Sequence, residues 1–238
     1  PGLVVAPTET QIEPTLADLL KQDLNIDLDR GGLVHRLDKD TSGVMVVAKT
    51  QEALDTLQSQ FKERIVAKQY LALAHGWLTQ NYAVNAPIMR NPGDREKFIV
   101  HQEGREAQTQ IDIEQKYRLS EEQLSQIFED YNKIQMRKLD ASQYGLFTLV
   151  KCSPKTGRTH QIRVHLKYIN HSLVGDAKYG GRKLSRLDHR WCPRQFLHAH
   201  QLEFNHPVTN DRLKFVSPLA ADLVASLAKL ETVPNDQS

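Results

Sequence analysis

The stretch from residue 33 to 49, LVHRLDKDTSGVMVVAK, constrains the fold more than any other part of the chain. It opens with two apolar residues and closes with Val44–Ala48, whose length and β-branched content predict a strand. A polar loop held between two buried segments is typical of a functional site. We therefore expect chemistry at Arg36 and Asp38. For Asp40–Gly43, a turn bonded to its own backbone explains the residue types equally well.

Length and composition describe a soluble globular protein. The chain has 238 residues, of which 39% are hydrophobic and 25% charged, enough for one well-packed domain or two small ones. No apolar run approaches the roughly 20 residues of a membrane helix, and no signal segment opens the chain. The two cysteines, Cys152 and Cys192, form no disulfide framework, which predicts a reducing compartment and a cytoplasmic location.

Positive charge is concentrated in one region. Residues 151–194 contain eleven lysines and arginines and two acidic residues, Asp176 and Asp188, a local charge of +9 that leaves −7 for the remainder. Such asymmetry is typical of a surface that meets a polyanion. The alternative is a basic face that is merely solvated.

Hydrophobic periodicity and capping residues predict the main elements. We expect helices over 16–24 (capped by Thr15), 51–64 (capped by Thr50) and 121–139, one starting after Thr159, and a last one starting at Pro218 with Ser217 as its cap. Strands are expected over 67–76 and 145–152, with a meander between 86 and 113.

The string HRLDKDTSG resembles the active-site signature of the RluA/RluD-type pseudouridine synthases, and the family's catalytic aspartate falls on Asp38. AKQYLALAHG is similar to the second family motif, whose tyrosine falls on Tyr70. TGRTHQIRVHL is similar to the third, which contains Arg158, Ile162 and Arg163. VGDAKYGGR and FLHAHQLEFNHPVT bring the resemblance closest to the RluD branch. One departure is Ala6, where the family pattern has histidine.

The resemblance implies a single α/β (α+β) catalytic domain over 1–238, with a folded core to 233 and a tail over 234–238. It should contain a large, mostly antiparallel mixed sheet with flanking helices. A further N-terminal RNA-binding domain could precede Pro1. Residues 119–143 look like an insertion relative to the shorter hairpin usual in the family, and the sequence predicts no function for them.

The implied activity is isomerisation of uridine to pseudouridine in RNA, most simply large-subunit ribosomal RNA or its precursor particle. The protein would act as a monomer without cofactor, metal or membrane. Alternatives are the same chemistry on transfer or other RNA, and a non-catalytic RNA-binding or ribosome-assembly module. Zinc at residues 189–200 is disfavoured, because one cysteine with scattered histidines lacks the spacing of a closed site.

The chemistry assigns a role to each residue of the resemblance. The target nucleotide must leave the RNA stack, and Arg36 could fill the vacated place and hold phosphate. Tyr70 and Ile162 would contact the base, and Arg158 would bind RNA. Asp38 must be ionised, either as a nucleophile at the sugar or as a base at C2′, and the sequence does not choose between them. Arg163 would keep that carboxylate charged.

Overall fold

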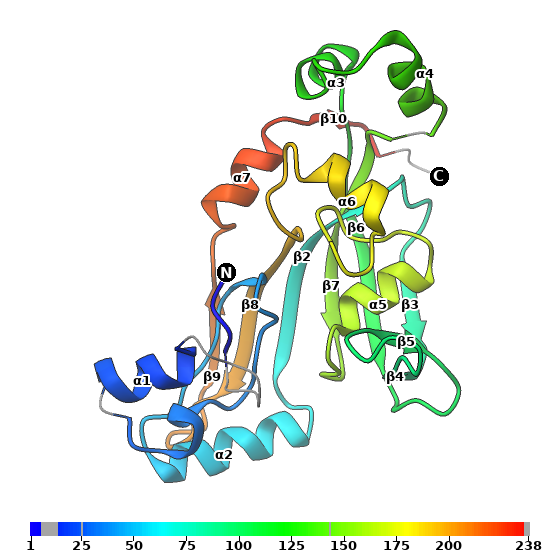
Figure 1. Ribbon diagram of the computed structural model, residues 1–238. Coiled ribbons are helices and arrows are strands. Elements are labelled where there is room, and N and C mark those ends of the chain that lie inside the picture. The colour runs from blue at the N-terminus through cyan, green and yellow to red at the C-terminus, as the bar shows by residue number, and fades with distance from the viewer. Residues whose placement is uncertain (6–13, 25, 143, 236–238) are drawn as a thin grey trace. The chain divides into compact units, whose positions relative to one another are not determined.

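The computed structural model describes residues 1–5, 14–24, 26–142 and 144–235. Its helices are α1 Leu16–Leu24, α2 Gln51–Lys62, α3 Glu121–Ile127, α4 Lys133–Ala141, α5 Gln161–Tyr168, α6 Arg182–Asp188 and α7 Ala221–Leu227, with a 3-10 helix at Asp29–Gly32. Its strands are β1 Ser42–Gly43, β2 Ala67–His75, β3 Tyr82–Asn85, β4 Ile88–Arg90, β5 Phe98–Val100, β6 Gln108–Arg118, β7 Leu146–Pro154, β8 Leu197–Asn205, β9 Arg212–Val216 and β10 Glu231–Val233. Figure 1 labels helices α1 to α7 and strands β2 to β10.

Eight of the described strands form one mixed sheet, and β4 pairs with β5 in a separate hairpin. β1 and β8 run parallel, whereas β9 on β8, β2 on β7, and β3, β7 and β10 on β6 are antiparallel. The predicted α/β (α+β) class, with a large and mostly antiparallel mixed sheet and flanking helices, is therefore confirmed.

The chain divides into two compact units, residues 1–69 with 198–218 and residues 70–197 with 219–238. The first unit is assembled from two segments far apart in the sequence. Its core joins α2 to β8 through Leu54, Leu57, Val66, Leu202 and Phe204, with Ala48 beside them. That the whole chain acts as one catalytic domain stays a prediction.

Both helices of the first unit begin where the sequence predicts. The Thr15 amide donates to the Asp18 carboxylate at 2.8 Å, and the Asp18 amide donates to the Thr15 hydroxyl at 3.3 Å, a reciprocal cap for α1. Thr50 accepts from the Ala53 amide at the start of α2. α2 ends before the predicted position, and Arg64 then adopts a left-handed φ of 64°.

The predicted strand over Val44–Ala48 is wrong. Only Ser42–Gly43 pairs in register with β8, and Val47 forms an isolated bridge with Leu33. The amides of this run are used elsewhere: Val46 donates to His35 Nε2 at 3.1 Å, and Ala48 donates to the Gly32 carbonyl at 2.9 Å. Only Val44 continues the pairing with β8, because its amide donates to the Ala199 carbonyl at 2.9 Å; the rest of the apolar run closes the loop onto itself.

The sheet of the second unit is built around β6, the longest strand described. β7 covers one edge of β6, and the other edge is shared: β3 pairs with Gln108–Ile111 and β10 with Lys116–Arg118. Alternation along β2 is as predicted. Leu73 packs on one face with Phe147 and Trp191, whereas Ala72 and Ala74 pack on the other.

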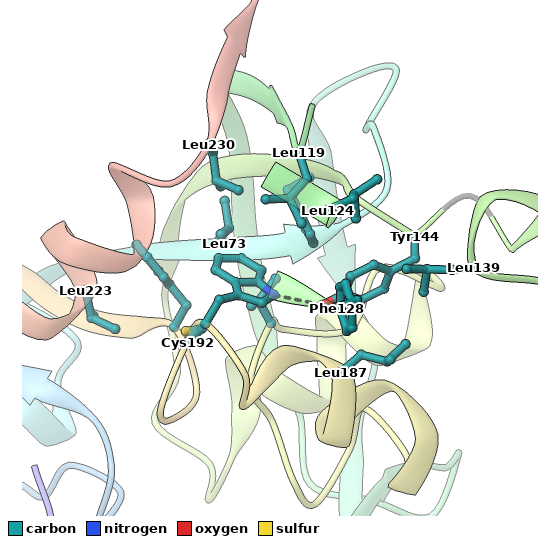
Figure 2. Packing of buried hydrophobic residues seen from close by; sticks show 14 residues of the cluster. Leu73, Leu119, Leu124, Phe128, Leu139, Tyr144, Leu187, Cys192, Leu223 and Leu230 are labelled. Atoms are coloured by element: carbon teal, nitrogen blue, oxygen red, sulfur yellow. Dashed lines mark hydrogen bonds between the residues drawn. The ribbon is translucent and has the colours of Figure 1, made fainter. Parts of the chain in front are cut away.

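The single helix predicted over 121–139 is wrong. Two helices replace it because each has its own capping box, Ser120 with Gln123 for α3 and Asn132 with Gln135 for α4. Of the apolar residues of the helical pattern, Leu124 and Phe128 are buried and Ile127 and Tyr131 pack against them, whereas Ile134 is exposed. Figure 2 shows Phe128, Leu139 and Tyr144 within the same cluster as Leu187 of α6.

Three further boundaries differ from the prediction. α5 is not capped by Thr159: His160 occupies the N-cap with φ 56° and no side-chain bond to the helix. α7 begins at Ala221 with Ala220 as its cap, and not at Pro218 with Ser217 as its cap, and the sequence did not predict β10, which follows it. Of the predicted tail, residues 236–238 lie outside the described ranges, as does Ala6.

Candidate active site

The signature loop of the first unit holds Asp38 at the start of a tight turn. The Thr41 amide donates to the Asp38 carbonyl at 2.9 Å, which closes the turn over two exposed residues. Leu37, immediately before Asp38, is buried, whereas Arg36 is exposed and Asp38 half-buried. The backbone of Asp38 is therefore anchored on both sides.

The end of the loop is fixed by β8. The Ser42 hydroxyl lies 2.9 Å from His198 Nδ1, and both side chains are buried. Gly43 has φ +122°, and a Cβ there would lie 2.2 Å from the Ala199 carbonyl oxygen. Glycine is required here because the backbones of β1 and β8 touch. The predicted turn at Asp40–Gly43 thus relies on a distant strand as well as on its own backbone.

His35 fixes the beginning of the loop. Its Nε2 accepts from the Val46 amide at 3.1 Å, and its ring stacks on Phe61 with centroids 4.8 Å apart. An acceptor nitrogen requires the neutral ring. Burial, helped by the positive charge of Lys68, lowers the pKa of His35 to about 4, so the imidazole is neutral at physiological pH.

In the second unit, Tyr70 and Ile162 belong to one apolar cluster. Tyr70 is half-buried on β2, opposite Cys152 of β7, and packs against the cluster that contains buried Ile162 of α5. The small side chains Ala72 and Ala74 line the same face of β2. The structure therefore brings together the tyrosine and the isoleucine that the resemblance assigns to the base.

Arg163 is held by a carboxylate to which the sequence analysis gave no role. Its Nε donates to Asp176 Oδ2 at 2.8 Å and its Nη2 to Asp176 Oδ1 at 2.9 Å, in a buried two-pronged ion pair. The guanidinium carbon also lies 5.0 Å from the Tyr179 ring centroid. Asp176 is itself fixed, because the amides of Lys178 and Tyr179 donate to Oδ1. The ion pair uses the Nε–Nη2 edge of the guanidinium and does not involve Nη1.

The loop before α5 is organised by Gln161. Its buried amide donates to the Gln108 carbonyl and the Thr109 hydroxyl, while its oxygen accepts from the Thr156 hydroxyl and the Arg158 amide. Arg158 Nε also donates to the carbonyl of Glu106 at 2.9 Å. Gln161, the first residue of α5, thus fixes the loop that leads into the helix.

Asp176 and Tyr179 are the residues that sequence reasoning missed. The signal was present: Asp176 is one of two acids among eleven cations between 151 and 194. An acid isolated in such a stretch, next to a glycine, is a candidate for an internal ion pair. No group of three or more His, Cys, Asp or Glu residues is placed to hold a metal ion in the parts of the chain that are described. None of the helices described there combines the length and apolar character needed to cross a membrane.

Residues 1–168 match the model of the RNA pseudouridylate synthase family. The chain belongs to this family. Its signature loop, Tyr70 strand and Arg163 helix all lie within the matched residues.

Relatives agree with this membership. The chain is 39% identical to the ribosomal large subunit pseudouridine synthase D of Xanthomonas campestris over 96% of its own length and 64% of the relative's. It is 37% identical to the ribosomal large subunit pseudouridine synthase C of Escherichia coli over 83% and 56%. The solved structure of human RNA pseudouridylate synthase domain containing 1 shares the fold, with a TM-score of 0.69 at 24% identity over 99% and 91% of the two chains. The chain spans less than two thirds of the length of these two curated relatives.

Proposed function

We propose that the protein isomerises uridine to pseudouridine in RNA and that its substrate is large-subunit ribosomal RNA. Family membership and the names of the curated relatives support the reaction and the class of RNA. The observation that carries the proposal is the anchored turn at Asp38. Fixing a carboxylate between a buried residue and a hydrogen-bonded turn suits a group that must meet one atom of a substrate.

Asp38 and the residues around Arg163 would act on the same nucleotide. The reaction breaks the bond from C1′ to N1 of uracil and joins C1′ to C5, and the C5 proton is lost while N1 gains one. Asp38 would begin it as an ionised carboxylate, either by attacking the sugar or by removing the C2′ proton. Arg163, presenting the guanidinium edge that Asp176 does not use, would keep the Asp38 carboxylate charged.

Tyr70 and Ile162 would hold the flipped uracil. A flat ring beside an aliphatic side chain and two alanines offers an apolar face on which a base can stack, worth about 1–3 kcal/mol. Arg36, which is exposed, would take the place of the nucleotide in the RNA stack or hold its phosphate. Arg158 would contact RNA next to the same site.

Both units would act together as one catalytic domain and as a monomer. The buried free thiols Cys152 and Cys192 suit a reducing compartment, so we place the activity in the cytoplasm.

The decisive experiment maps pseudouridines in ribosomal RNA from cells that lack the gene. We expect specific large-subunit uridines to lose modification, and expect the wild-type gene, but not Asp38→Asn, to restore it. Survival of every ribosomal pseudouridine would contradict the proposed substrate. Loss confined to transfer RNA would keep the chemistry and replace the substrate.

A further inference from the structure

Five of the eleven basic residues between 151 and 194 are engaged inside the protein. Each pairs with an acidic residue: Lys151–Glu114, Arg163–Asp176, Lys178–Glu96, Arg190–Asp130 and Arg194–Asp222. Four of these acids lie outside the basic stretch, and the fifth, Asp176, is buried within it. The local charge of this stretch therefore overstates what is available to a polyanion. The cations available to a polyanion are therefore those that make no such ion pair and are exposed on a rigid element.

Helix α6 carries three such cations. Arg182, Lys183 and Arg186 are exposed, whereas Ser185 and Leu187 are buried, so the helix has one basic face and one core face. No acidic residue in the described ranges forms an ion pair with any of the three cations. Arg182 and Arg186 are one turn apart and thus neighbours on the helix surface.

The core face of α6 is locked by its last residue, Asp188, which is completely buried. Its Oδ1 accepts from the Tyr144 hydroxyl at 2.9 Å. Its Oδ2 accepts from the Gly175 amide at 2.9 Å and lies 2.9 Å from His75 Nε2. Trp191 Nε1 donates to the Tyr144 oxygen at 2.7 Å, the dashed bond in Figure 2. One carboxylate thus ties α6 to β2 and to the segment before Asp176.

This network fixes α6 relative to Arg163. Gly175, whose amide Asp188 binds, is bonded directly to Asp176, which holds the Arg163 guanidinium. Gly175 itself is wedged against the Arg194 carbonyl, 2.1 Å from where a Cβ would lie. The basic face of α6 is therefore held in a fixed position relative to Arg163.

We propose that Arg182, Lys183 and Arg186 of α6 bind RNA phosphates that flank the target nucleotide. This inference rests on the proposed function, because it takes RNA as the ligand and Arg163 as part of the site that holds the base. Exposed lysines and arginines on a rigid helix contact the backbone without reading bases, so they fix the position of the RNA and not its sequence. The internally paired cations of the stretch do not contribute.

The test replaces all three cations, Arg182→Gln, Lys183→Gln and Arg186→Gln, in the full chain. The matched control removes three exposed cations from another helix of the same unit, Lys133→Gln, Arg137→Gln and Lys138→Gln on α4. Binding of a transcribed fragment of large-subunit ribosomal RNA is measured by filter binding between about 50 and 200 mM salt. Tritium release from the 5-tritiated fragment gives KM separately, and urea unfolding checks that each variant is folded.

Each lost phosphate contact should reduce the slope of log affinity against log salt by about 0.7–0.9. For three contacts, the wild type should lose about 20–40-fold more affinity than the α6 variant over this salt range. KM should rise for the α6 variant, while the α4 variant should retain both the wild-type slope and the wild-type KM.

Equal effects of the two variants would show general attraction by net charge and overturn the inference, as would an α6 variant with unchanged slope or a wild type that fails to bind. A wild type that binds RNA through α6 yet releases no tritium from any uridine would instead contradict the proposed function and leave this surface standing.

Discussion

Asp176→Asn should lower the free energy of unfolding and abolish tritium release. The side chain of Asp176 is 0% exposed and that of Arg163 is 8% exposed, and all four hydrogen bonds that the carboxylate accepts come from Arg163 or from the amides of residues 178 and 179. Asparagine keeps the size, but its NH₂ group would face one of these donors. Breaking a buried ion pair from one side costs about 3–5 kcal/mol. For a chain of this length, such a loss lowers Tm by roughly 6–20 °C.

The assay is urea unfolding followed by tryptophan fluorescence, to which buried Trp191 contributes, together with tritium release at saturating RNA. Asp222→Asn is the matched control, because Asp222 also binds an arginine through both oxygens but is 36% exposed. We expect that control to lose about 1 kcal/mol or less. If Asp176→Asn lost no more than Asp222→Asn, the assignment of Asp176 as the group that holds Arg163 would be refuted.

Three other outcomes are expected. Asp38→Asn should abolish tritium release while RNA affinity by filter binding stays within a few-fold; full release from this variant would exclude Asp38 as the catalytic residue. Gly43→Ala, whose Cβ would lie 2.2 Å from the Ala199 oxygen, should lower the free energy of unfolding by at least about 1–3 kcal/mol. Gly93→Ala, with its nearest atom at 3.6 Å, is the control for this steric effect and should change little. The pKa of His35 is about 4 in the folded chain, below its ordinary value of 6.5, so the unfolded state takes up the proton first. The stability that His35 contributes should be present above pH 6.5 and be lost as the pH falls towards 4, and urea unfolding of His35→Gln should show a weaker pH dependence over this range.

The sequence correctly predicted helix starts and strand alternation, because these depend on interactions between residues that are close together in the chain. Thr15 and Thr50 cap helices because the cap is made within one turn, and the alternation along β2 follows from the pleat. The same kind of local signal marks the division of residues 121–139 at Asn132, since the spacing of Asn132 and Gln135 is that of a capping box.

Predictions failed where a distant partner decides the outcome. Val44–Ala48 has the composition of a strand, yet the Val46 amide donates to His35 and the Ala48 amide to the Gly32 carbonyl. The ion pair of Arg163 with Asp176 depends on a turn that folds back onto α5, and no periodicity reveals it. The sequence overstates the local positive charge of residues 151–194 for a related reason, because four of the five acids that pair with its cations lie outside it in the sequence.

The pairing of β1 with β8 has a consequence for the order in which the protein can be completed. The turn that carries Asp38 is fixed by Ser42 and Gly43, which contact His198 and Ala199. During synthesis, His198 and Ala199 leave the ribosome only after all of residues 70–197. Until then, the signature loop has no partner strand with which to pair. Contacts of such long sequence separation form late, because closing the intervening chain segment costs conformational entropy before the stabilising contacts can form. The nascent chain acquires its rigid Asp38 turn only once its C-terminal part has been made.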